Sequence, residues 1–451
     1  MNINKYTAYR VYSLKNIKKA IFFNVKNRKY IILEGLSAEL FELLYNESES
    51  KLSEWCCRNE INQQDIVDFV AQLKELDILD EDDKNLSSDC DTNSEKPERS
   101  DNDPNIVNLL SEELFENGLF YSFHLDLTNK CNARCIHCYH TFDKYDYSKE
   151  IPLSKIKSLI DTIYDLGVFS IVLSGGEALL RDDFFDILEY ISNKGMLITL
   201  FTNGMLLSEE TVQKLALYRI SVVSISVYGH NAFLQDTITS IKGSFEKTLK
   251  GIEYLKKNKI EFDLKCVMLK ENATYITEIS DFCKQLNYNR ECILDFTLSG
   301  KIDGDCCTYD HKISYECLKE IYYSSPDNFI GKLSDYTRHP NSIPCGAGRH
   351  GLYCSADGKI YPCVGFRLYL CDIDSLENIN DNATLKEWQK KRLSDFTDCF
   401  KHTYCKYCLE QCAGNNLIEN SNYLCSAISH CERAKIIEEW FSKSESATSN
   451  R

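Results

Sequence analysis

The sequence predicts an α/β protein with a parallel β-sheet at its centre, a small winged-helix-like module before the sheet and a cysteine-rich region after it. From residue 122 onward, short apolar runs that are typical of strands alternate with amphipathic helical segments. Repeated β-α units bring their strands into one parallel sheet, either a barrel or an open, doubly wound sheet. Cysteines become dense from residue 345. Because 451 residues exceed one typical core, we expect at least two domains.

Residues 1–80 predict the winged-helix-like module. Residues 20–33, AIFFNVKNRKYIIL, contain two apolar runs on either side of a polar turn, which is typical of a hairpin. Helical segments follow, and one of them has apolar residues at i, i+3, i+4 and i+7, namely Ile66, Phe69, Val70 and Leu73. This shape is common in DNA-binding proteins. The module carries 11 basic and 12 acidic side chains, however, so it has no net positive field to attract phosphates.

An acidic stretch separates this module from the rest of the chain. Residues 80–103 contain ten acidic and three basic side chains and almost no large apolar residue, so we expect a solvated linker over residues 81–108. Few contacts should then hold the module to the central sheet. The whole chain has 52 Lys and Arg against 68 Asp and Glu, a net charge of −16, which argues against a nucleic-acid partner.

The central sheet is expected within residues 109–330. Its six predicted strands are 122–127, 170–173, 197–201, 222–227, 262–269 and 293–298. The helix after the first strand has an apolar face made of Ile156, Leu159, Ile160 and Ile163. In a β/α barrel the carboxyl ends of all strands meet at one face, where active sites lie. Polar residues that directly follow these strands are therefore candidate site residues.

Cysteine usage indicates metal chemistry. The chain has 22 cysteines, begins with MNINKYTAYR and shows no apolar start. We therefore expect no secretory signal, a cytoplasmic location and no membrane association, since no run approaches the roughly 18 apolar residues of a span. Thiols in a reducing compartment do not form stable disulfides, so metal or iron–sulfur ligation is the leading interpretation.

Three cysteines follow the first predicted strand of the sheet. Cys131, Cys135 and Cys138 are spaced C-x3-C-x2-C, which allows three thiolates to surround one cubane cluster. A 4Fe–4S cluster ordinarily takes four cysteines, so three leave one iron open for another ligand. We expect His137 and His140, which lie beside this motif, not to be ligands.

Further candidate residues follow the second, third and fourth strands. Gly175 and Gly176 would let a ligand approach the backbone, and the carboxylate of Glu177 can accept hydrogen bonds from an ammonium group. Asn203 ends the third strand and could bind a ribose, and Ser226 lies in the fourth strand. Each of these polar residues also has an ordinary explanation as a turn or core residue. No catalytic residue can be named from the sequence.

CNARCIHC, SGGE, TNG and SIS occur in this order, and together they resemble the radical S-adenosylmethionine (SAM) superfamily over about residues 120–320. The resemblance implies a partial (β/α)6 barrel and a 4Fe–4S cluster whose open iron binds the amine and carboxylate of SAM. One electron then splits SAM into methionine and a 5′-deoxyadenosyl radical, so the cofactor supplies the chemistry and the barrel positions it. By the same resemblance, Cys131, Cys135 and Cys138 hold this cluster.

The resemblance also assigns the SAM contacts. Glu177 in the Gly175-Gly176 loop corresponds to the partner of the SAM amine, and Asn203 and Ser226 correspond to further contacts. The family's Arg-Gly-x-x-Gly-x-Phe stretch appears as TSIKGSF over residues 239–245, without the arginine. A charged contact to SAM from that arginine is therefore not expected.

The C-terminal cysteines show a second resemblance. The spacing Cys345-x12-Gly358-x4-Cys363 resembles the start of a SPASM domain, a domain that carries auxiliary iron–sulfur clusters, and we expect it over residues 340–440. Its usual later run is C-x2-C-x5-C-x3-C, followed by a last cysteine. This chain has a shorter middle spacing, and Asn416 stands where the fourth cysteine of the run would fall.

We expect one or two auxiliary 4Fe–4S clusters from this pattern. One set is expected to comprise Cys405, Cys408, Cys412 and Cys431. Cys345 and Cys363 anchor the other, with further candidates in Cys354, Cys371 and Cys399. A zinc site at the CKYC run remains an alternative.

The N-terminal module has a resemblance of its own. YIILEGLSAELFELL resembles the precursor-recognition module of ribosomal peptide maturases, similar to the chaperone of pyrroloquinoline-quinone biosynthesis, over about residues 5–80. That module holds a leader peptide along a strand edge through main-chain hydrogen bonds. The segment CGAGRHGLYCSADGKIYPC resembles the same region of subtilosin-type thioether synthases. The three parts together resemble sactipeptide and ranthipeptide maturases.

These resemblances imply an enzyme that forms a cysteine thioether crosslink in a precursor peptide, with a reducing flavodoxin or ferredoxin as electron donor. One alternative is carbon–carbon crosslinking or another side-chain oxidation, as in sulfatase maturases. A different class is a non-catalytic iron–sulfur protein that binds peptides or transfers electrons. The C-x3-C-x2-C and GGE motifs argue against that class, because neither task needs an open iron beside a SAM pocket.

Overall fold

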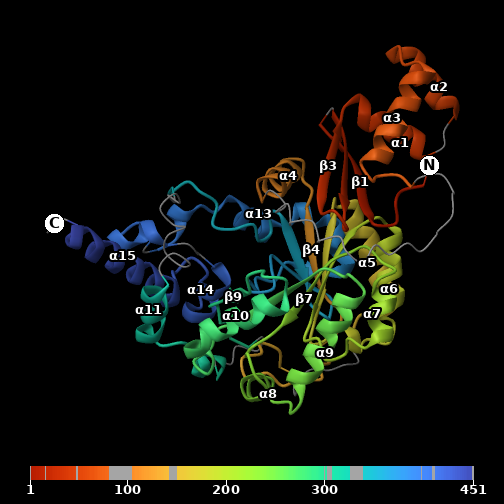
Figure 1. Ribbon diagram of the computed structural model, residues 1–451. Helices are drawn as coiled ribbons and strands as arrows, with labels where there is room; N and C mark the ends of the chain where they lie inside the picture. Colours follow the sequence, from red (N-terminus) through yellow and green to blue (C-terminus); the bar gives the residue numbers. More distant parts are fainter. Residues whose placement is uncertain are drawn as a thin grey trace.

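The computed structural model describes residues 2–15, 17–46, 49–80, 104–141, 150–298, 300–301, 307–325, 339–397, 399–408 and 412–448. Figure 1 shows three parts: an N-terminal sheet with its helices, a central sheet flanked by helices, and a helical C-terminal part. Residues 81–103 of the expected linker lie outside the described ranges. Residues 104–108 of that linker belong instead to helix α4 (Pro104–Glu116).

The N-terminal part is a three-stranded antiparallel sheet, in the order β1-β2-β3, followed by three helices. The strands are β1 (Thr7–Leu14), β2 (Ile17–Asn24) and β3 (Lys29–Glu34). The helices are α1 (Leu36–Tyr45), α2 (Glu49–Asn59) and α3 (Gln63–Glu75). The predicted hairpin is β2 and β3, and β1 is an additional strand. Helix α3 begins at a capping box in which Asn62 and Asp65 bond each other's backbone N–H groups.

The N-terminal sheet packs tightly on the central sheet, so the expectation of few contacts between them is wrong. Apolar residues from both parts form one cluster: Ala8, Tyr12, Leu14, Ile21 and Phe23 with Leu110, Leu114, Tyr121, Phe169 and Leu197. The backbone N–H of Tyr9 donates to the Gly195 carbonyl at 2.9 Å, and the Tyr12 hydroxyl donates to the Gly167 carbonyl at 2.9 Å. Shared apolar burial of this kind stabilises both parts together.

The central sheet contains all six predicted strands, and they are parallel. They are β4 (Ser122–Asp126), β5 (Ser170–Ser174), β6 (Leu197–Thr202), β7 (Ile220–Ser226), β8 (Phe262–Val267) and β9 (Ile293–Asp295). Strand β10 (Gly351–Cys354) joins in parallel beside β4, and β11 (Lys359–Tyr361) and β12 (Cys371–Asp372) continue antiparallel. The order is β12-β11-β10-β4-β5-β6-β7-β8-β9. Its two ends do not pair, so the barrel is open.

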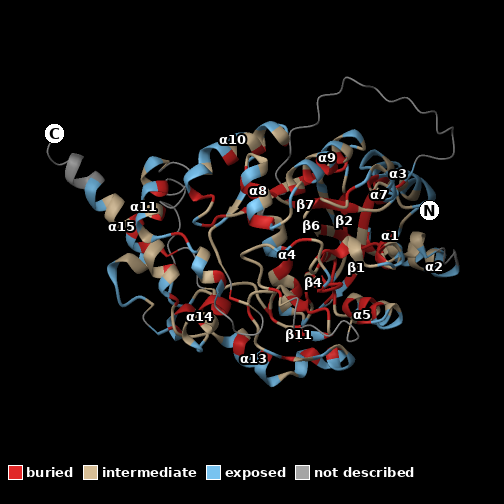
Figure 2. Cartoon of the chain, turned by 90° about the horizontal axis from the view of Figure 1, so that it is seen from below, coloured by how far each residue is buried: buried red, intermediate tan, exposed pale blue. Residues whose placement is uncertain are grey.

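Amphipathic helices cover the outer face of this sheet (Figure 1). They are α5 (Leu153–Asp165), α6 (Phe184–Asn193), α7 (Glu209–Leu215), α8 (Ala232–Thr239), α9 (Ser244–Lys257) and α10 (Ile276–Leu286). Helix α11 (Tyr315–Ser324) instead packs against the C-terminal helix α15 (Ile428–Thr448). The predicted apolar face of α5 is buried, with Ile156, Ile160 and Ile163 at 0% exposure. Burying each such side chain contributes roughly 1.5–3 kcal/mol. Figure 2 shows that the buried residues of these helices face inward and the exposed ones face outward.

The C-terminal part has little regular sheet. Its helices are α13 (Ala383–Lys390), α14 (Ala413–Asn420) and α15 (Ile428–Thr448). Phe366 packs against Trp388 and Tyr423, with ring centroids 4.7 and 5.5 Å away.

Short 3₁₀ helices also occur across the chain. They lie at Ala178–Leu180, Ala273–Tyr275, Cys307–His311, Ile373–Asp381, Leu393–Asp395 and Thr403–Tyr407. Among the described residues, no helix is long and apolar enough to cross a membrane.

Candidate active site

The first three motif cysteines lie together in the loop that follows β4. Burial raises the pKa of the Cys135 thiol, and the charges of Cys138 and Cys131 raise it further. Burial raises the pKa of Cys138 to about 12, with an added contribution from Cys131. Three half-buried thiols whose charges act on one another fit a 4Fe–4S cluster, because iron replaces their protons and stabilises the thiolates. Within the described ranges, no three His, Cys, Asp or Glu side chains surround the position of a single metal ion.

The cysteine loop is fixed against the end of α8. The backbone N–H groups of Arg134 and Ile136 donate to the carbonyls of Thr239 and Ile238, each at 3.0 Å. The Cys138 N–H donates to the Cys135 carbonyl at 3.0 Å, which curls the loop.

Two glycines bring the next loop against the cysteine loop. Gly175 has φ +132°, and a Cβ there would lie 2.3 Å from the Thr128 carbonyl oxygen. A Cβ on Gly176 would lie 2.4 Å from the Lys130 carbonyl oxygen. The Gly176 N–H donates to Thr128 at 2.8 Å. From the sequence, these glycines are expected to let a ligand approach the backbone. In the structure, their lack of a side chain lets the backbone just before Cys131 pack closely against this loop.

Glu177, in the same loop, is buried and hydrogen-bonded. Its carboxylate accepts bonds from the Thr202 hydroxyl at 2.9 Å, the Asn203 N–H at 2.9 Å and the Leu179 N–H at 3.3 Å. Burial raises the pKa of Glu177 to about 7, although these hydrogen bonds favour the charged form. Glu177 thereby anchors the end of β6, and the Asn203 side chain reaches Asn132 at 2.7 Å.

The predicted residues therefore form one group at the carboxyl ends of β4 to β7. The Asn203 Nδ2 atom lies 4.0 Å from the Cys131 Sγ atom, which links the cysteine loop to the Glu177 loop. Ser226 ends β7 on the same side and is partly buried. Burial of the imidazole, with a smaller contribution from the charge of His311, lowers the pKa of His137 to about 4, and its ring packs 4.8 Å from that of Tyr228.

A buried polar cluster beside this group was not predicted. The Tyr353 hydroxyl on β10 donates to the Asp126 Oδ2 atom at 2.5 Å. The His124 Nε2 atom lies 3.4 Å from Asp126 Oδ1, and His140 Nε2 lies 3.9 Å from Oδ2. Burial alone would raise the pKa of Asp126, but the neighbouring His124 and His140 and the Tyr353 hydroxyl together outweigh it and hold the pKa below its ordinary value. Arg367 lies over the Tyr353 ring at 4.5 Å.

Side chains from alternate strands meet inside the open barrel. His124 on β4 packs edge-on to Phe201 on β6 at 5.8 Å, and the Lys265 Nζ atom on β8 lies 3.9 Å from the centre of the same ring. Strands two apart in the sheet order make such contacts only across its concave face. Burial lowers the pKa of Lys265. The sequence did contain a sign of this polar cluster. His124 and Asp126 are two positions apart in the first strand, so their side chains lie on the same face of the sheet.

The C-terminal cysteines form two neighbourhoods that differ from the predicted sets. Burial raises the pKa of Cys399 to about 11, and the charges of Cys408, Cys405 and Cys431 add to the rise, which places these four thiols close together. The Cys399 Sγ atom is also 3.3 Å from the Ser426 hydroxyl.

Burial raises the pKa of Cys363, and the charge of Cys412, which was predicted to join Cys405 and Cys408, adds to this rise. Cys354 is fully buried on β10, and the charge of Cys371 contributes to its raised pKa. Cys345 is partly buried and packs against the main core.

Comparison with known proteins identifies the central domain. Residues 125–283 match the model of the Radical SAM superfamily. The AdoMet-dependent heme synthase of Methanosarcina barkeri is 35% identical over 161 residues, which are 36% of this chain and 46% of that protein. The chain thus spans about half the length of that relative.

Two further similarities extend beyond the central domain. The antilisterial bacteriocin subtilosin biosynthesis protein AlbA of Bacillus subtilis is 26% identical over 325 residues, covering 67% of this chain and 69% of AlbA. The crystal structure of Streptococcus suis SuiB bound to precursor peptide SuiA matches with a TM-score of 0.58 and 16% identity, covering 95% of this chain and 99% of that one. The SuiB similarity shows a shared fold.

Proposed function

Since residues 125–283 form a radical SAM domain, whose family uses a 4Fe–4S cluster and SAM, we propose that this protein modifies a ribosomally made precursor peptide. The specific product we propose is a thioether between a peptide cysteine and a carbon of another residue. AlbA, named for subtilosin biosynthesis, supports this proposal because its similarity extends over about two thirds of both chains. The SuiB fold covers the N-terminal and C-terminal parts as well, and because that structure holds the precursor peptide SuiA, it supports a peptide substrate rather than a particular crosslink.

In this proposal the cluster is held by Cys131, Cys135 and Cys138. When bound and reduced, it supplies the electron that splits SAM and so generates a radical able to remove a hydrogen atom from the peptide. Glu177, which anchors Thr202 and the Asn203 N–H, would accept a hydrogen bond from the SAM amine, and Asn203 and Ser226 would contact SAM at the ends of β6 and β7.

We further propose that the N-terminal part binds the leader of the peptide. Strand β3 pairs with β2 on one side, and its other side pairs with no strand in the part of the chain that the structure describes. An unpaired edge offers main-chain donors and acceptors to an added strand. The balanced charge of this module does not support DNA binding, because it provides no net positive field to attract phosphates.

Auxiliary clusters are also part of the proposal. The neighbourhood of Cys399, Cys405, Cys408 and Cys431 supports a fully ligated 4Fe–4S cluster, with Cys399 in place of the expected Cys412. Cys363, Cys412 and Cys345 would hold a second cluster whose last ligand is open. A reducing flavodoxin or ferredoxin would supply the electrons.

The single observation that carries this function is the meeting of three half-buried thiols with the Glu177 loop at the carboxyl ends of the parallel strands. The experiment is anaerobic reconstitution with iron and sulfide, followed by reduction in the presence of SAM. We expect 5′-deoxyadenosine from the intact protein and none from a Cys135→Ala variant. A reconstituted protein that binds iron but never cleaves SAM would contradict the proposal and favour an electron carrier.

The product distinguishes a thioether from carbon–carbon crosslinking. Candidate precursors are short cysteine-containing reading frames beside the gene. A thioether removes two hydrogens from the peptide and leaves its cysteine unreactive to iodoacetamide. Loss of two hydrogens with a fully alkylated cysteine would instead indicate a carbon–carbon bond.

A further inference from the structure

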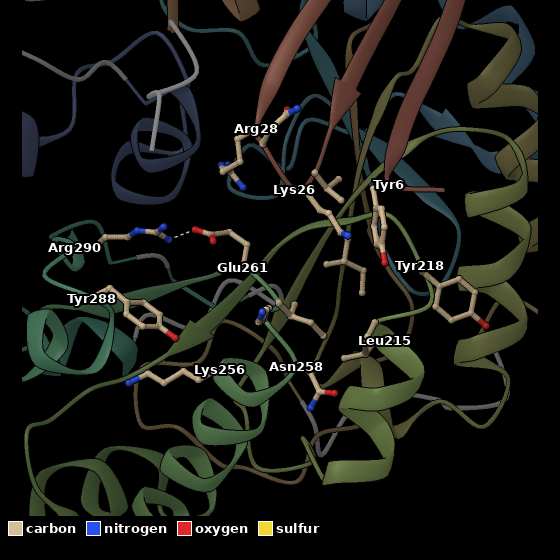
Figure 3. A pocket seen from close by; sticks show the side chains of 16 residues that line it. Tyr6, Lys26, Arg28, Leu215, Tyr218, Lys256, Asn258, Glu261, Tyr288 and Arg290 are labelled. Carbon is tan, nitrogen blue, oxygen red and sulfur yellow. Dashed lines mark hydrogen bonds and ion pairs between the residues drawn. The ribbon is translucent and has the colours of Figure 1, made fainter. Parts of the chain in front are cut away.

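A cavity of about 740 Å³ lies between the N-terminal sheet and the central sheet, away from the cysteine loop. Its walls include Arg28 in the β2–β3 turn, Ile220 at the start of β7, Glu261 just before β8 and Arg290 before β9. These residues precede the parallel strands, whereas the motif cysteines and Glu177 follow them. Figure 3 shows Tyr6, Lys26 and Arg28 reaching from the N-terminal strands over Lys256 and Asn258. The cavity is thus a second site at the opposite end of the barrel.

The cavity is strongly basic although the whole chain is acidic. Five basic side chains line it, and they are Lys26, Arg28, Lys256, Lys259 and Arg290. Glu261 is the one acidic side chain in the lining, and it forms an ion pair with Arg290. The chain as a whole has a net charge of −16. Gathering like charges is unfavourable in the empty protein, so their concentration here favours an anionic occupant.

The rest of the lining includes aromatic and aliphatic side chains beside Asn27 and Asn258. The Lys26 Nζ atom lies 3.6 Å from the centre of the Tyr6 ring, and the Lys256 Nζ atom lies 5.3 Å from that of Tyr288. Leu215 and Ile220 add apolar surface to the lining. A compact phosphate would contact only the basic side chains. A peptide with alternating acidic and apolar side chains would contact both the basic and the apolar side chains of the lining.

The cavity lies next to the start of β3. Arg28 lines the cavity and is followed directly by Lys29, the first residue of that strand. Arg28 also donates to the Ser221 carbonyl at 2.9 Å, which fixes the turn against the central sheet. A peptide strand added along β3 as far as Lys29 would therefore end close to Arg28 and the basic lining.

We propose that this cavity binds an acidic segment of the precursor peptide, next to the segment held on β3. The inference rests on the proposed function and assigns a charge pattern to its substrate. Strand β7 has seven residues and is about 23 Å long. At least about seven extended residues must then separate the acidic segment from the residue that is modified at the other end of the barrel.

The test uses the intact, reconstituted protein and a synthetic, fluorescein-labelled peptide of alternating Glu and Leu. Its affinity is measured by fluorescence anisotropy for the intact protein and for a Lys26→Glu, Lys256→Glu double variant. We expect the double variant to bind at least about tenfold more weakly, and binding by the intact protein to weaken as salt rises. A control double variant, Lys247→Glu and Lys250→Glu, changes the same charge on exposed positions of α9 outside the cavity and should bind as the intact protein does.

Three results would overturn the inference: equal affinity of the cavity and control variants, equal binding of a Gln-for-Glu peptide, or displacement of the peptide by equimolar inorganic phosphate. Formation of 5′-deoxyadenosine from SAM alone is measured on the same samples. If that reaction is intact while the acidic peptide does not bind, only the cavity inference fails. If SAM is not cleaved, the proposed function fails, whatever the peptide does. A Lys26→Gln, Lys256→Gln variant, which only removes charge, should give an intermediate affinity.

Discussion

The guanidinium of Arg10, on β1, donates a hydrogen bond of 3.0 Å to the carbonyl of Val168, the residue two positions before β5. Arg10 is 7% exposed, and its guanidinium also lies 3.9 Å from the centre of the Tyr164 ring. A buried cation is costly unless it is well hydrogen-bonded, so this contact requires the N-terminal sheet to stay in place. The N-terminal sheet is therefore part of the structure that supports the barrel.

Arg10→Ala should lower the free energy of unfolding by roughly 2–3 kcal/mol, because charge-assisted hydrogen bonds and buried packing are both lost. The measurement is urea denaturation followed by far-ultraviolet circular dichroism. Lys15→Ala is the control, since Lys15 forms only an exposed ion pair with Glu116, and it should change stability by less than about 0.5 kcal/mol. For the same reason, removal of residues 1–80 should destabilise the barrel rather than affect peptide recognition alone. A truncated chain as stable as the intact one would contradict this prediction.

Cys135→Ala should abolish SAM cleavage. With two of its three thiolates the cluster should not persist, and its open iron is the expected anchor of SAM. The assay is quantitation of 5′-deoxyadenosine after anaerobic reconstitution. Cys57→Ala, on an exposed position of α2, is the matched control and should keep full yield. Near-normal cleavage by the Cys135 variant would rule out the assigned cluster site.

Glu177→Ala should retain iron and lose SAM affinity. A charge-assisted hydrogen bond contributes roughly 1.5–3 kcal/mol, so the dissociation constant should rise on the order of tenfold to a hundredfold. Equilibrium binding of SAM to the reconstituted protein measures this change. Glu210→Ala, on an exposed carboxylate at the start of α7, should leave the affinity unchanged. If both variants bind SAM equally well, Glu177 serves only to anchor Thr202 and Asn203.

The stability of the cluster-free protein should fall as pH rises from about 4.5 to 7. Burial raises the pKa of Glu177 from 4.5 to about 7, so the folded state holds a proton that the unfolded state releases. The contribution of the neutral carboxyl is complete below pH 4.5 and is lost as pH rises through 7, a change of roughly 3 kcal/mol. Denaturation curves across this range, compared with those of Glu177→Gln, isolate the effect. If Glu177→Gln shows the same pH dependence of stability as the intact protein, the pH dependence comes from other titratable groups.

Changing Cys131, Cys135 and Cys138 together to Ala should leave iron–sulfur absorption in the reconstituted protein. The remaining thiols form the two C-terminal neighbourhoods, one around Cys399 and one around Cys363. Adding Cys399→Ala to this triple variant should lower its iron content further, whereas adding Cys56→Ala should not. A folded triple variant without visible absorption would count against auxiliary clusters.

The sequence predicted the elements of the central sheet well because β5, β6 and β7 are mainly apolar runs, while β4 and β8 alternate apolar and polar residues. Strand β1 was not predicted, since TAYRVYSL mixes polar and apolar residues and its buried face forms only against the central sheet. The cluster around Asp126 was missed for a related reason. Tyr353 lies 227 positions away in the sequence, and only the pairing of β10 with β4 brings the two side chains together.

The grouping of the C-terminal cysteines was a harder problem. Spacing shows which thiols can reach one centre from the same loop, but it contains no information about which distant segment completes the set. Cys399 approaches Cys431 because Thr397 and Ser426 bond across two segments: the Thr397 N–H donates to the Leu424 carbonyl at 2.8 Å, and the Ser426 hydroxyl donates to the Thr397 carbonyl at 3.0 Å. Such long-range bonds appear only in the folded chain.

The parallel pairing of β10 with β4 determines what happens to a shortened protein. Four residues of β10 cover the side of β4 that β5 does not occupy. A chain that ended before β10 would leave β4 as a bare edge, with a row of unsatisfied backbone donors and acceptors next to buried apolar residues. Such edges recruit strands from other molecules, so a protein trimmed to its SAM-binding region would aggregate rather than work as a minimal enzyme.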